Sequence, residues 1–357
     1  MVTISLCMIV RNEEASLDNC LASAKDIADE IIIVDTGSTD NTKEIASKYT
    51  DKIYDFEWID DFSAARNFSF SKATKDYIFW LDADDVISPE NAKKILQLKN
   101  EDLVYDAYIF TYNYNFDTDG TPSLIEHVER LLRRTSNPEW IGAIHEYIPV
   151  ENKTYIVLDN IEIDHRHVKT NSNERNLRIF KKLETEGHVF TLREKFLYGL
   201  ELMRVREYKT AYDMLKEYID ADTKHKGMLT QAIAKASLCK LHLNDAVSAE
   251  QLIRNNAHRI NMDAELLCIL ASTLYEQKRY EEAISVYATA MSCDTTIIPE
   301  KATYKAHSTL LPYLGTAECY IKLGLKDQAK AFNDKARAID PDDPTVKKNQ
   351  NLILMML

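Results

Sequence analysis

One short stretch constrains the fold of this chain more than any other. Five apolar residues, 77–81, run directly into the aspartates Asp82, Asp84 and Asp85. An apolar run this short and this rich in aromatic residues predicts a strand buried on both faces. Open α/β sheets place their ligand groups beyond the carboxyl ends of the strands, where these carboxylates fall. They predict a divalent-cation site or, as the alternative, an acidic turn before a helix that begins near Ser88.

The rest of the first half repeats a pattern of apolar strand followed by helix. The strand-like segments are 3–10, 30–35, 52–56 and 77–81, and the segments with helical spacing are 15–28, 42–49 and 62–73. This alternation predicts parallel βαβ units, and therefore an α/β fold with a mostly parallel sheet. The first, second and fourth strands end in polar residues, which we expect to lie together at one edge of the sheet.

A nucleotide-binding glycine motif is missing from the sequence. Neither G-x-G-x-x-G nor G-x-x-x-x-G-K-[ST] occurs, which argues against a dinucleotide-binding Rossmann domain and a P-loop. A nucleotide must then be held by carboxylates, a metal and basic side chains. Arg66 precedes the fourth strand and offers a planar guanidinium suited to phosphate. The alternative for Arg66 is a surface ion pair with Asp60 or Asp61.

Length and composition narrow the class of protein. A chain of 357 residues has room for about two domains. Its net charge of −13 argues against a nucleic-acid partner or an anionic membrane surface. The six cysteines lack zinc-binding spacing and indicate a reduced protein, and no apolar run approaches the roughly 20 residues of a membrane span. We therefore expect a cytoplasmic protein without an integral membrane segment and without a signal peptide.

Four motifs occur in order within the first half. They are ISLCMIVRNEE at 4–14, IVDTGSTD at 33–40, FSAARN at 62–67 and WLDADD at 80–85. Together they closely resemble the family 2 glycosyltransferases, which have a GT-A fold with a Rossmann-like, mostly parallel sheet. The resemblance implies an inverting transfer from a UDP-sugar, such as UDP-glucose or UDP-N-acetylglucosamine, assisted by Mg²⁺ or Mn²⁺.

Position within these motifs implies roles for particular residues. Val10 and Arg11 would lie along the nucleoside pocket, and Asn12 and Glu13 belong to the same loop. Asp35 would accept a hydrogen bond from uracil.

The resemblance implies a second group of contacts near the diphosphate. Arg66 would face the diphosphate or the base, and Asp82, followed by Ala83, would contact the ribose or the sugar. Asp84 would be a ligand of the metal.

The segment 106–164 is rich in strand-like residues and contains the candidate base. An inverting displacement needs a group that accepts the proton of the attacking acceptor. Glu146 is that candidate, within a Trp-x-Gly-x-x-His-Glu pattern that resembles glycosyltransferases with appended helical repeats, and His145 would help to orient the site. The alternative for Glu146 is a salt bridge with one of the basic residues Arg130, Arg133 and Arg134. The alternative for Trp140 is packing in the core.

Two histidines follow the next strand. Neutral imidazole is a common ligand of Mn²⁺. His165 is the better candidate to complete the metal site with Asp84, and His167 is the second. A single histidine is more often structural, which is the alternative. Lys169 and Arg175 are candidates to close over the diphosphate.

Helical spacing replaces the strand pattern after about residue 172. Four windows share a turn, an alanine and following apolar residues, with the alanines at Ala211, Ala249, Ala283 and Ala329. Their spacings are 38, 34 and 46 residues, and a period near 34 is typical of tetratricopeptide (TPR) repeats. The longer last spacing is filled by residues 295–307, expected to be a loop between repeats. Such arrays of helix pairs commonly bind extended peptides or other subunits.

These observations predict two domains, a GT-A domain at 1–170 and an all-α TPR-like domain at 171–357. The expected function is transfer of a hexose from a UDP-sugar to a Ser, Thr or Cys side chain of a peptide or protein. A similar architecture occurs in the S-glycosyltransferases of glycosylated bacteriocins. The alternatives are an enzyme for a cell-envelope glycan or lipid-linked acceptor, and an inactive GT-A scaffold with partner-binding repeats. We also expect a homodimer through the helical domain, with the apolar C-terminus 352–357 packed on the last repeat or on the second subunit.

Overall fold

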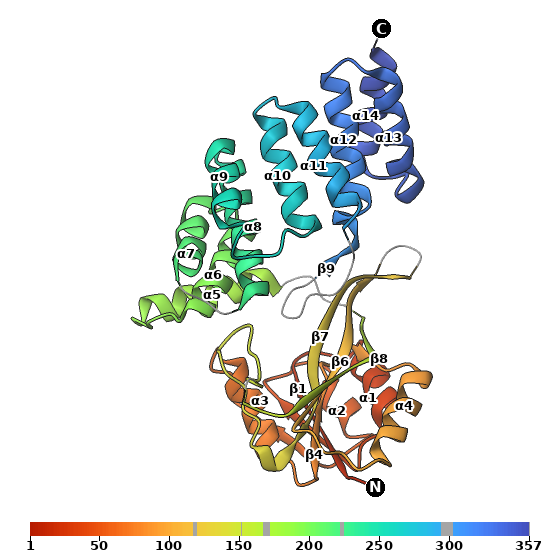
Figure 1. Cartoon of the computed structure of the whole chain (residues 1–357). Coiled ribbons are helices and arrows are strands. Elements are labelled where there is room, and N and C mark those ends of the chain that lie inside the picture. The colour runs from red at the N-terminus through yellow and green to blue at the C-terminus, as the bar shows by residue number, and fades with distance from the viewer. Residues whose placement is uncertain (117–119, 151, 167–171, 222–224, 294–302, 357) are drawn as a thin grey trace. The chain divides into compact units, whose positions relative to one another are not determined.

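The protein contains two compact units. The computed structural model describes residues 1–116, 120–150, 152–166, 172–221, 225–293 and 303–356 (Figure 1). The units are Met1–His188 and Val189–Leu357. The boundary expected from the sequence fell near residue 170, whereas helix α5 (Ser172–Thr185) is part of the first unit.

The first unit is built around one mixed sheet. Its strands lie in the order β3-β2-β1-β4-β7-β6-β8-β5. Pairs β2–β3, β1–β2, β1–β4 and β6–β8 are parallel, and pairs β4–β7, β6–β7 and β5–β8 are antiparallel. The strands are β1 (Ile4–Val10), β2 (Glu30–Asp35), β3 (Ile53–Asp55), β4 (Tyr77–Trp80), β5 (Asp85–Val86), β6 (Ala107–Phe116), β7 (Pro122–Arg133) and β8 (Tyr155–His165). The predicted α/β fold with a mostly parallel sheet is confirmed.

Helices cover both faces of the parallel part of this sheet. The helices are α1 (Leu17–Ala24), α2 (Thr42–Ala46), α3 (Phe62–Ser71) and α4 (Pro89–Lys99), and a 3₁₀ turn η1 (Arg134–Ser136) follows β7. Alternate residues of β4 enter two separate cores, with Phe79 on the side of α1 and Ile78 on the side of α3. Because a strand covered on both faces needs apolar residues at every position, the continuous apolar runs of the sequence are explained.

The register of the strands brings the polar ends together. Val10 lies opposite Asp35, and Cys7 lies opposite Trp80, so β1, β2 and β4 end at the same edge of the sheet. At the other end of the strand order, β5 pairs with β8 and sets Asp85 opposite His165. One edge of the sheet therefore carries the loops after β1, β2 and β4.

The second unit is an array of antiparallel helix pairs. Its helices are α6 (Leu192–Arg204), α7 (Tyr208–Asp220), α8 (Lys226–His242), α9 (Ala246–Asn256), α10 (Ala264–Glu276), α11 (Tyr280–Met291), α12 (Leu310–Lys322), α13 (Lys326–Ile339) and α14 (Pro344–Met355), with the short elements β9 (Thr303–Tyr304) and η2 (Lys305–His307) before α12. Each helix from α6 to α12 packs on the next, and α13 packs on α12 and α14. The predicted repeat organisation is confirmed.

The four alanines of the repeat pattern explain this packing. Ala211, Ala249, Ala283 and Ala329 lie on α7, α9, α11 and α13, and each is completely buried. A small side chain at these positions lets the second helix of each pair approach the first. Within the described residues, no helix is long and apolar enough to cross a bilayer.

Candidate active site

A closed turn after β4 carries the aspartates of the anchor motif. The Asp82 N–H donates to Asp85 Oδ2 at 2.9 Å, and the Asp85 N–H donates to the Asp82 carbonyl at 3.1 Å. Ala83 is buried in this turn, and the side chain of Asp84 is 16% exposed. The predicted helix start is also present, since Ser88 caps α4 by accepting from the Asn91 N–H. The acidic turn and the helix cap therefore occur together.

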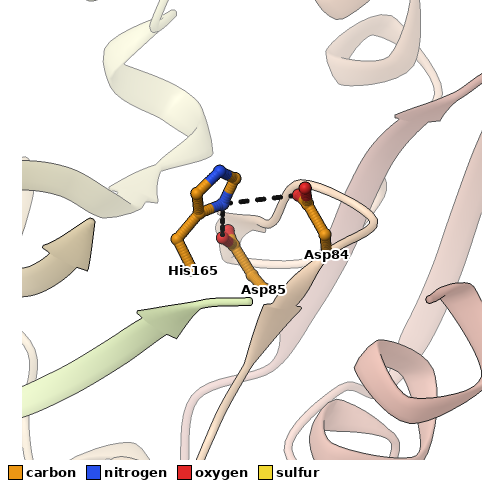
Figure 2. A group of neighbouring side chains, drawn as sticks. All are labelled: Asp84, Asp85 and His165. Carbon is orange, nitrogen blue, oxygen red and sulfur yellow. Dashed lines mark hydrogen bonds and ion pairs between the residues drawn. The ribbon is translucent and has the colours of Figure 1, made fainter. Parts of the chain in front are cut away.

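Asp84 and His165 meet, as Figure 2 shows. His165 Nδ1 lies 3.4 Å from Asp84 Oδ1 and 3.2 Å from Asp85 Oδ1. Potential ligand atoms of the three residues lie within 4.8 Å of one another. A carboxylate and an imidazole are a donor set that suits Mn²⁺ and is compatible with Mg²⁺. The residues present fit the expected cation, and the ligand roles of Asp84 and His165 stay predictions.

The electrostatics of Asp84 also suit a cation. Burial raises the pKa of Asp84 to about 6, with contributions from the charges of Asp82, Asp85 and Glu13 against the opposing effect of His165. Burial would lower the pKa of His165, but the hydrogen bond with Asp85 and the charge of Asp84 raise it. Carboxylates gathered this closely are stabilised by a positive charge among them.

Asp85 is a residue of this site for which no role was expected from the sequence. It is completely buried, and its Oδ2 accepts from Arg130 Nη1 at 2.9 Å. Tyr112 Oη donates to its Oδ1 at 2.8 Å. The Arg130 guanidinium lies over the rings of Trp80 and Tyr112, at 3.9 and 4.3 Å from their centroids. The only signal in the sequence was a third aspartate in the motif.

Arg66 joins two carboxylates that are far apart in the sequence. Its Nη2 donates to Asp82 Oδ1 at 2.8 Å, and its Nε donates to Glu146 Oε1 at 2.7 Å. The guanidinium also lies over the rings of Trp80 and Trp140, at 4.8 and 4.7 Å. Burial would lower the pKa of Arg66, but the charges of Asp82 and Glu146 raise it. Contact of Arg66 with the diphosphate or the base stays a prediction.

The alternative assigned to Arg66, a surface ion pair, is wrong. Asp60 binds Arg178 and Lys182 of α5 instead, and Asp61 caps α3 by accepting from the Ala64 N–H. Arg66 is only 8% exposed, because α3 directs it under the loop that contains Glu146.

The loop that carries Glu146 is fixed on α3. Asn67 makes two hydrogen bonds of 2.9 Å with the backbone N–H and carbonyl of Trp140. Ile141 and Tyr147 pair across the loop, and Gly142 has a φ of +98°, a conformation that favours glycine. The side chain of Glu146 is 11% exposed.

The alternative salt bridges of Glu146 are also wrong. Arg130 binds Asp85, Arg133 binds Asp106, and the Arg134 Nε donates to the Lys75 carbonyl. Trp140 is 5% exposed and packs in the core as the alternative proposed, while its ring also lies under Arg66.

Only one oxygen of the Asp35 carboxylate accepts hydrogen bonds from the described residues. Its Oδ1 accepts from the backbone N–H groups of Gly37 and Ser38 at 3.0 and 2.9 Å. Its Oδ2 is buried and has no hydrogen-bond partner among the described residues. Buried polar atoms are rarely left in this state, so Oδ2 suits an N–H of a bound ligand such as uracil. Val10 is buried beside it, and its carbonyl accepts from Thr36.

The loop after β1 is tied to the loop after β2. Asn12 Oδ1 accepts from the Thr39 N–H at 2.7 Å, and the Glu13 N–H donates to Thr42 Oγ1 at 2.7 Å. These contacts give Asn12 and Glu13 a role in shaping the loop, and their contact with a nucleotide stays a prediction. Arg11, which precedes them in the same loop, is exposed.

Two of the remaining candidates, Arg175 and His145, belong to α5 or contact it. The Arg175 guanidinium lies 4.7 Å from the Phe62 ring centroid. Burial lowers the pKa of Arg175, and Glu146 and Arg11 are among the charges that act on it. His145 has a φ of 52° and its ring stacks on Phe180, with 6.4 Å between the centroids. The candidates His167 and Lys169 lie outside the described residues.

Comparison with known proteins identifies the first part of the chain. Residues 5–167 match the sequence model of "Glycosyl transferase family 2". This segment is a family 2 glycosyltransferase domain. It contains strands β2 to β8, nearly all of β1 and nearly all of the site residues.

Several curated proteins resemble the chain over part of its length. Glycosyltransferase SunS of the SPbeta prophage of Bacillus subtilis is 28% identical over 256 residues, which are 68% of this chain and 59% of SunS. A TPR repeat-containing protein of Synechococcus elongatus is 53% identical over 85 residues, 24% of this chain and 21% of that protein. The chain therefore spans less than two thirds of the length of these relatives.

Two solved structures are similar to parts of the chain. Staphylococcus aureus TarS has a TM-score of 0.41 at 15% identity, covering 69% of this chain and 54% of TarS. YrrB, described as a TPR protein with an unusual peptide-binding site, has a TM-score of 0.38 at 18% identity, covering 51% of this chain and 84% of YrrB.

Proposed function

We propose that this chain is an inverting glycosyltransferase. It moves a hexose from a UDP-sugar to a Ser, Thr or Cys side chain of a peptide or protein, with Mg²⁺ or Mn²⁺ in the site. The observation that carries this proposal is the meeting of Glu146 and Asp82 on the single guanidinium of Arg66, beside the Asp84–His165 pair. A candidate base, a sugar contact and a cation-binding pair are then held at one edge of the sheet.

The donor end of the site rests on Asp35 and on the cation pair. The buried Oδ2 of Asp35 accepts the N–H of uracil, which satisfies an otherwise unpaired oxygen. Asp84 and His165 would hold the cation, which would supply positive charge to neutralise the diphosphate leaving group. UDP-glucose and UDP-N-acetylglucosamine are the donors to test first.

The acceptor end rests on Glu146. Arg66 Nε lies 2.7 Å from Glu146 Oε1 and holds in place the carboxylate that would act as the general base. Glu146 takes the proton of the acceptor hydroxyl, while the oxygen of that hydroxyl forms a bond to the anomeric carbon. The bond from that carbon to the phosphate oxygen breaks, and UDP leaves with the electron pair. Attack from the opposite face gives the inverted product.

The helical unit favours a peptide acceptor over a small glycan. Arrays of helix pairs provide extended surfaces that bind peptides or other subunits. The similar protein SunS is named as a glycosyltransferase, and this supports sugar transfer rather than an inactive scaffold. Transfer to a cell-envelope glycan or a lipid-linked sugar is the second candidate, because it uses the same donor site.

A transfer assay with mass spectrometry tests the proposal. The protein is incubated with each UDP-sugar, Mn²⁺ and a library of peptides that contain Ser, Thr or Cys. We expect a mass increase of one hexose or N-acetylhexosamine on a peptide, lost in Asp84→Asn and retained in the control Asp106→Asn, which changes an aspartate paired with Arg133. Modification of glycan acceptors alone would favour the second candidate. Absence of both transfer and donor hydrolysis would reject an active enzyme.

A further inference from the structure

The antiparallel pair β6–β7 places one further carboxyl group on the side of the candidate site (Figure 1). In its register, Glu126 of β7 lies directly opposite Tyr112 of β6. Residues directly opposite each other in an antiparallel pair have their side chains on the same face of the sheet. Tyr112 is directed at the site, because its hydroxyl donates to Asp85 Oδ1 at 2.8 Å. Glu126 therefore lies on the face of the sheet that carries the site.

The neighbours of Glu126 on this pair of strands also contact the site. Tyr114, two residues further along β6 than Tyr112, stacks on His165 with 4.9 Å between the ring centroids. Arg130, four residues further along β7 than Glu126, lies over the Tyr112 ring at 4.3 Å from its centroid. The strand positions around Glu126 are thus occupied by side chains of the site rather than by side chains of the outer surface.

The carboxyl group of Glu126 has no protein partner among the described residues. Its side chain is half-buried, and no hydrogen bond or ion pair joins the carboxyl group to another described residue. Burial raises the pKa of Glu126, and the charges of Arg130 and His145 oppose this effect. Arg130 binds Asp85, and His145 directly precedes the candidate base Glu146. An enclosed acceptor without a protein donor is suited to a donor on a bound ligand.

The geometry of the proposed transfer indicates which part of a ligand reaches this carboxyl group. In an inverting displacement, the acceptor attacks the anomeric carbon from the side opposite to the leaving diphosphate. The hexose ring then lies between the diphosphate, at the Asp84–His165 pair, and the acceptor, at Glu146. The groups that act on Glu126 belong to these same two parts of the site. Hexose hydroxyl groups are donors, and an ionised carboxylate is an acceptor with about four lone-pair positions.

We propose that the carboxyl group of Glu126 accepts hydrogen bonds from hydroxyl groups of the transferred hexose and thereby contributes to the choice of sugar. The inference rests on the proposed function and adds a sugar contact from β7 to it. Hydrogen bonds in which one partner is charged are stronger than those between neutral groups, so this contact discriminates between sugars that differ in one hydroxyl group.

Two competing assignments give Glu126 a role in the cation site or in the fold. The described residues that could hold a metal together are Asp84, Asp85 and His165, without Glu126. A supporting role in the fold requires contacts, and the carboxyl group makes none with the described residues. A carboxyl group whose pKa is raised on folding also destabilises the folded state above its ordinary pKa, because the fold disfavours its ionised form. These observations favour a contact with a ligand.

The first experiment compares sugar binding with nucleotide binding in the full chain. Calorimetry with Mn²⁺ gives the Kd of UDP, UDP-glucose and UDP-N-acetylglucosamine for the wild type, Glu126→Ala and Glu126→Gln. For the UDP-sugar that the wild type prefers, we expect Glu126→Ala to raise the Kd about 10–100-fold, as for a lost hydrogen bond to a charged group. The Kd of UDP should stay unchanged, and Glu126→Gln, which keeps one acceptor oxygen, should lose less affinity. The control Glu90→Ala removes an exposed carboxylate paired with Lys94 and should change neither constant.

The second experiment identifies the hydroxyl group. Analogues of the preferred UDP-sugar that each lack one hydroxyl group are titrated into the wild type and Glu126→Ala. Removal of the donor that Glu126 binds leaves little for the substitution to remove, so the effect of Glu126→Ala should shrink for at least one analogue. An effect of the same size with every analogue would overturn the proposal.

Thermal unfolding near neutral pH separates sugar binding from a structural role. Because the ionised carboxyl group is disfavoured in the fold, we expect Glu126→Ala and Glu126→Gln to unfold at a Tm no lower than that of the wild type. A lower Tm together with a raised Kd for both UDP and the UDP-sugar would overturn the proposal in favour of a structural role.

The remaining outcomes separate this inference from the proposed function. A raised Kd for UDP itself at an unchanged Tm would overturn the inference in favour of a nucleotide or cation contact. An unchanged Kd for the UDP-sugar with a raised KM for the peptide acceptor would overturn it in favour of acceptor binding. In both outcomes the wild type still binds UDP. A wild type that binds neither UDP nor a UDP-sugar would instead reject the donor of the proposed function, and the hexose contact with it.

Discussion

At the scale of single residues, a substitution of Glu146 tests whether this side chain is the general base of the transfer. Glu146→Gln keeps the size of the side chain and a hydrogen-bond acceptor for Arg66 but cannot take a proton. We expect turnover with a hydroxyl acceptor to fall about 10²–10⁴-fold in a steady-state assay, with UDP affinity little changed. A thiol acceptor should lose less, because thiolate forms readily near neutral pH. Normal turnover with a hydroxyl acceptor would place the base elsewhere.

Arg66 permits a second test at this scale, because its two possible roles affect different constants. Lysine is a point charge that cannot hold Asp82 and Glu146 in the fork geometry of a guanidinium. If Arg66 positions Glu146, Arg66→Lys should lower kcat about 10²-fold, the effect of a misplaced catalytic group, and leave the Kd of UDP nearly constant. A large rise in the Kd of UDP by calorimetry, with normal kcat at saturation, would show instead that Arg66 contacts the nucleotide.

At the scale of elements, the start of β2 depends on one carboxylate. Glu30 is 8% exposed and accepts from Ser5, Lys52 and Thr74, which joins β2 to β1 and to the segment before β4. Burial alone would raise the pKa of Glu30, but these hydrogen bonds lower it to about 2 from 4.5. A lowered pKa in the folded state stabilises the protein above pH 4.5, and this stability is lost as the pH falls from 4.5 towards 2.

Glu30→Gln should therefore reduce the free energy of unfolding at pH 7 by about 1–3 kcal/mol, the cost of disturbing buried charged hydrogen bonds. The difference from the wild type should shrink at pH 3, as measured by urea unfolding at both pH values. The exposed Glu101, changed to Gln, serves as the control and should show no such difference at either pH. A pH-independent effect of Glu30→Gln would contradict the assigned ionisation.

The elements also show how far sequence reasoning reaches. The continuous apolar run 31–34 predicted β2 correctly, because a strand covered on both faces needs such a run. The contacts of Arg130 could not be predicted, because they depend on β7 lying antiparallel to β4, and periodicity contains no information on strand order. Arg66 and Glu146 were both singled out, but nothing in the sequence indicated that they bind each other across 80 positions.

At the scale of the whole molecule, the two units allow the donor and acceptor roles to be separated. A chain that ends after His188 keeps α5, whose Arg178 and Lys182 bind Asp60. We expect this shorter chain to hydrolyse the donor and to lose transfer to its peptide acceptor. Circular dichroism establishes that it is folded. Transfer to the peptide at the normal rate would contradict recruitment by the repeats and favour the small-glycan acceptor.

The proposed homodimer is tested at the end of the repeats. Helix α14 exposes Leu354 and Met355, which are 72% and 79% accessible, while Ile353 is buried. Exposed apolar residues at the end of a repeat array suit contact with a second copy. We expect light scattering to give a dimer for the full chain and a monomer for Leu354→Lys with Met355→Lys. A monomeric full chain would reject the dimer.

The position of Trp80 makes the tryptophan fluorescence of the protein sensitive to changes in the site. The guanidinium groups of Arg66 and Arg130 lie 4.8 and 3.9 Å from the centroid of the Trp80 ring, and the centroids of the Trp80 and Trp140 rings are 4.8 Å apart. The emission wavelength of an indole depends on the charges beside it, so any ligand that shifts either arginine alters the fluorescence of this pair. Only three tryptophans are present, and Trp58 packs on Phe62. Replacing Trp58 by Phe would leave a natural reporter that senses occupation of the site without an added dye.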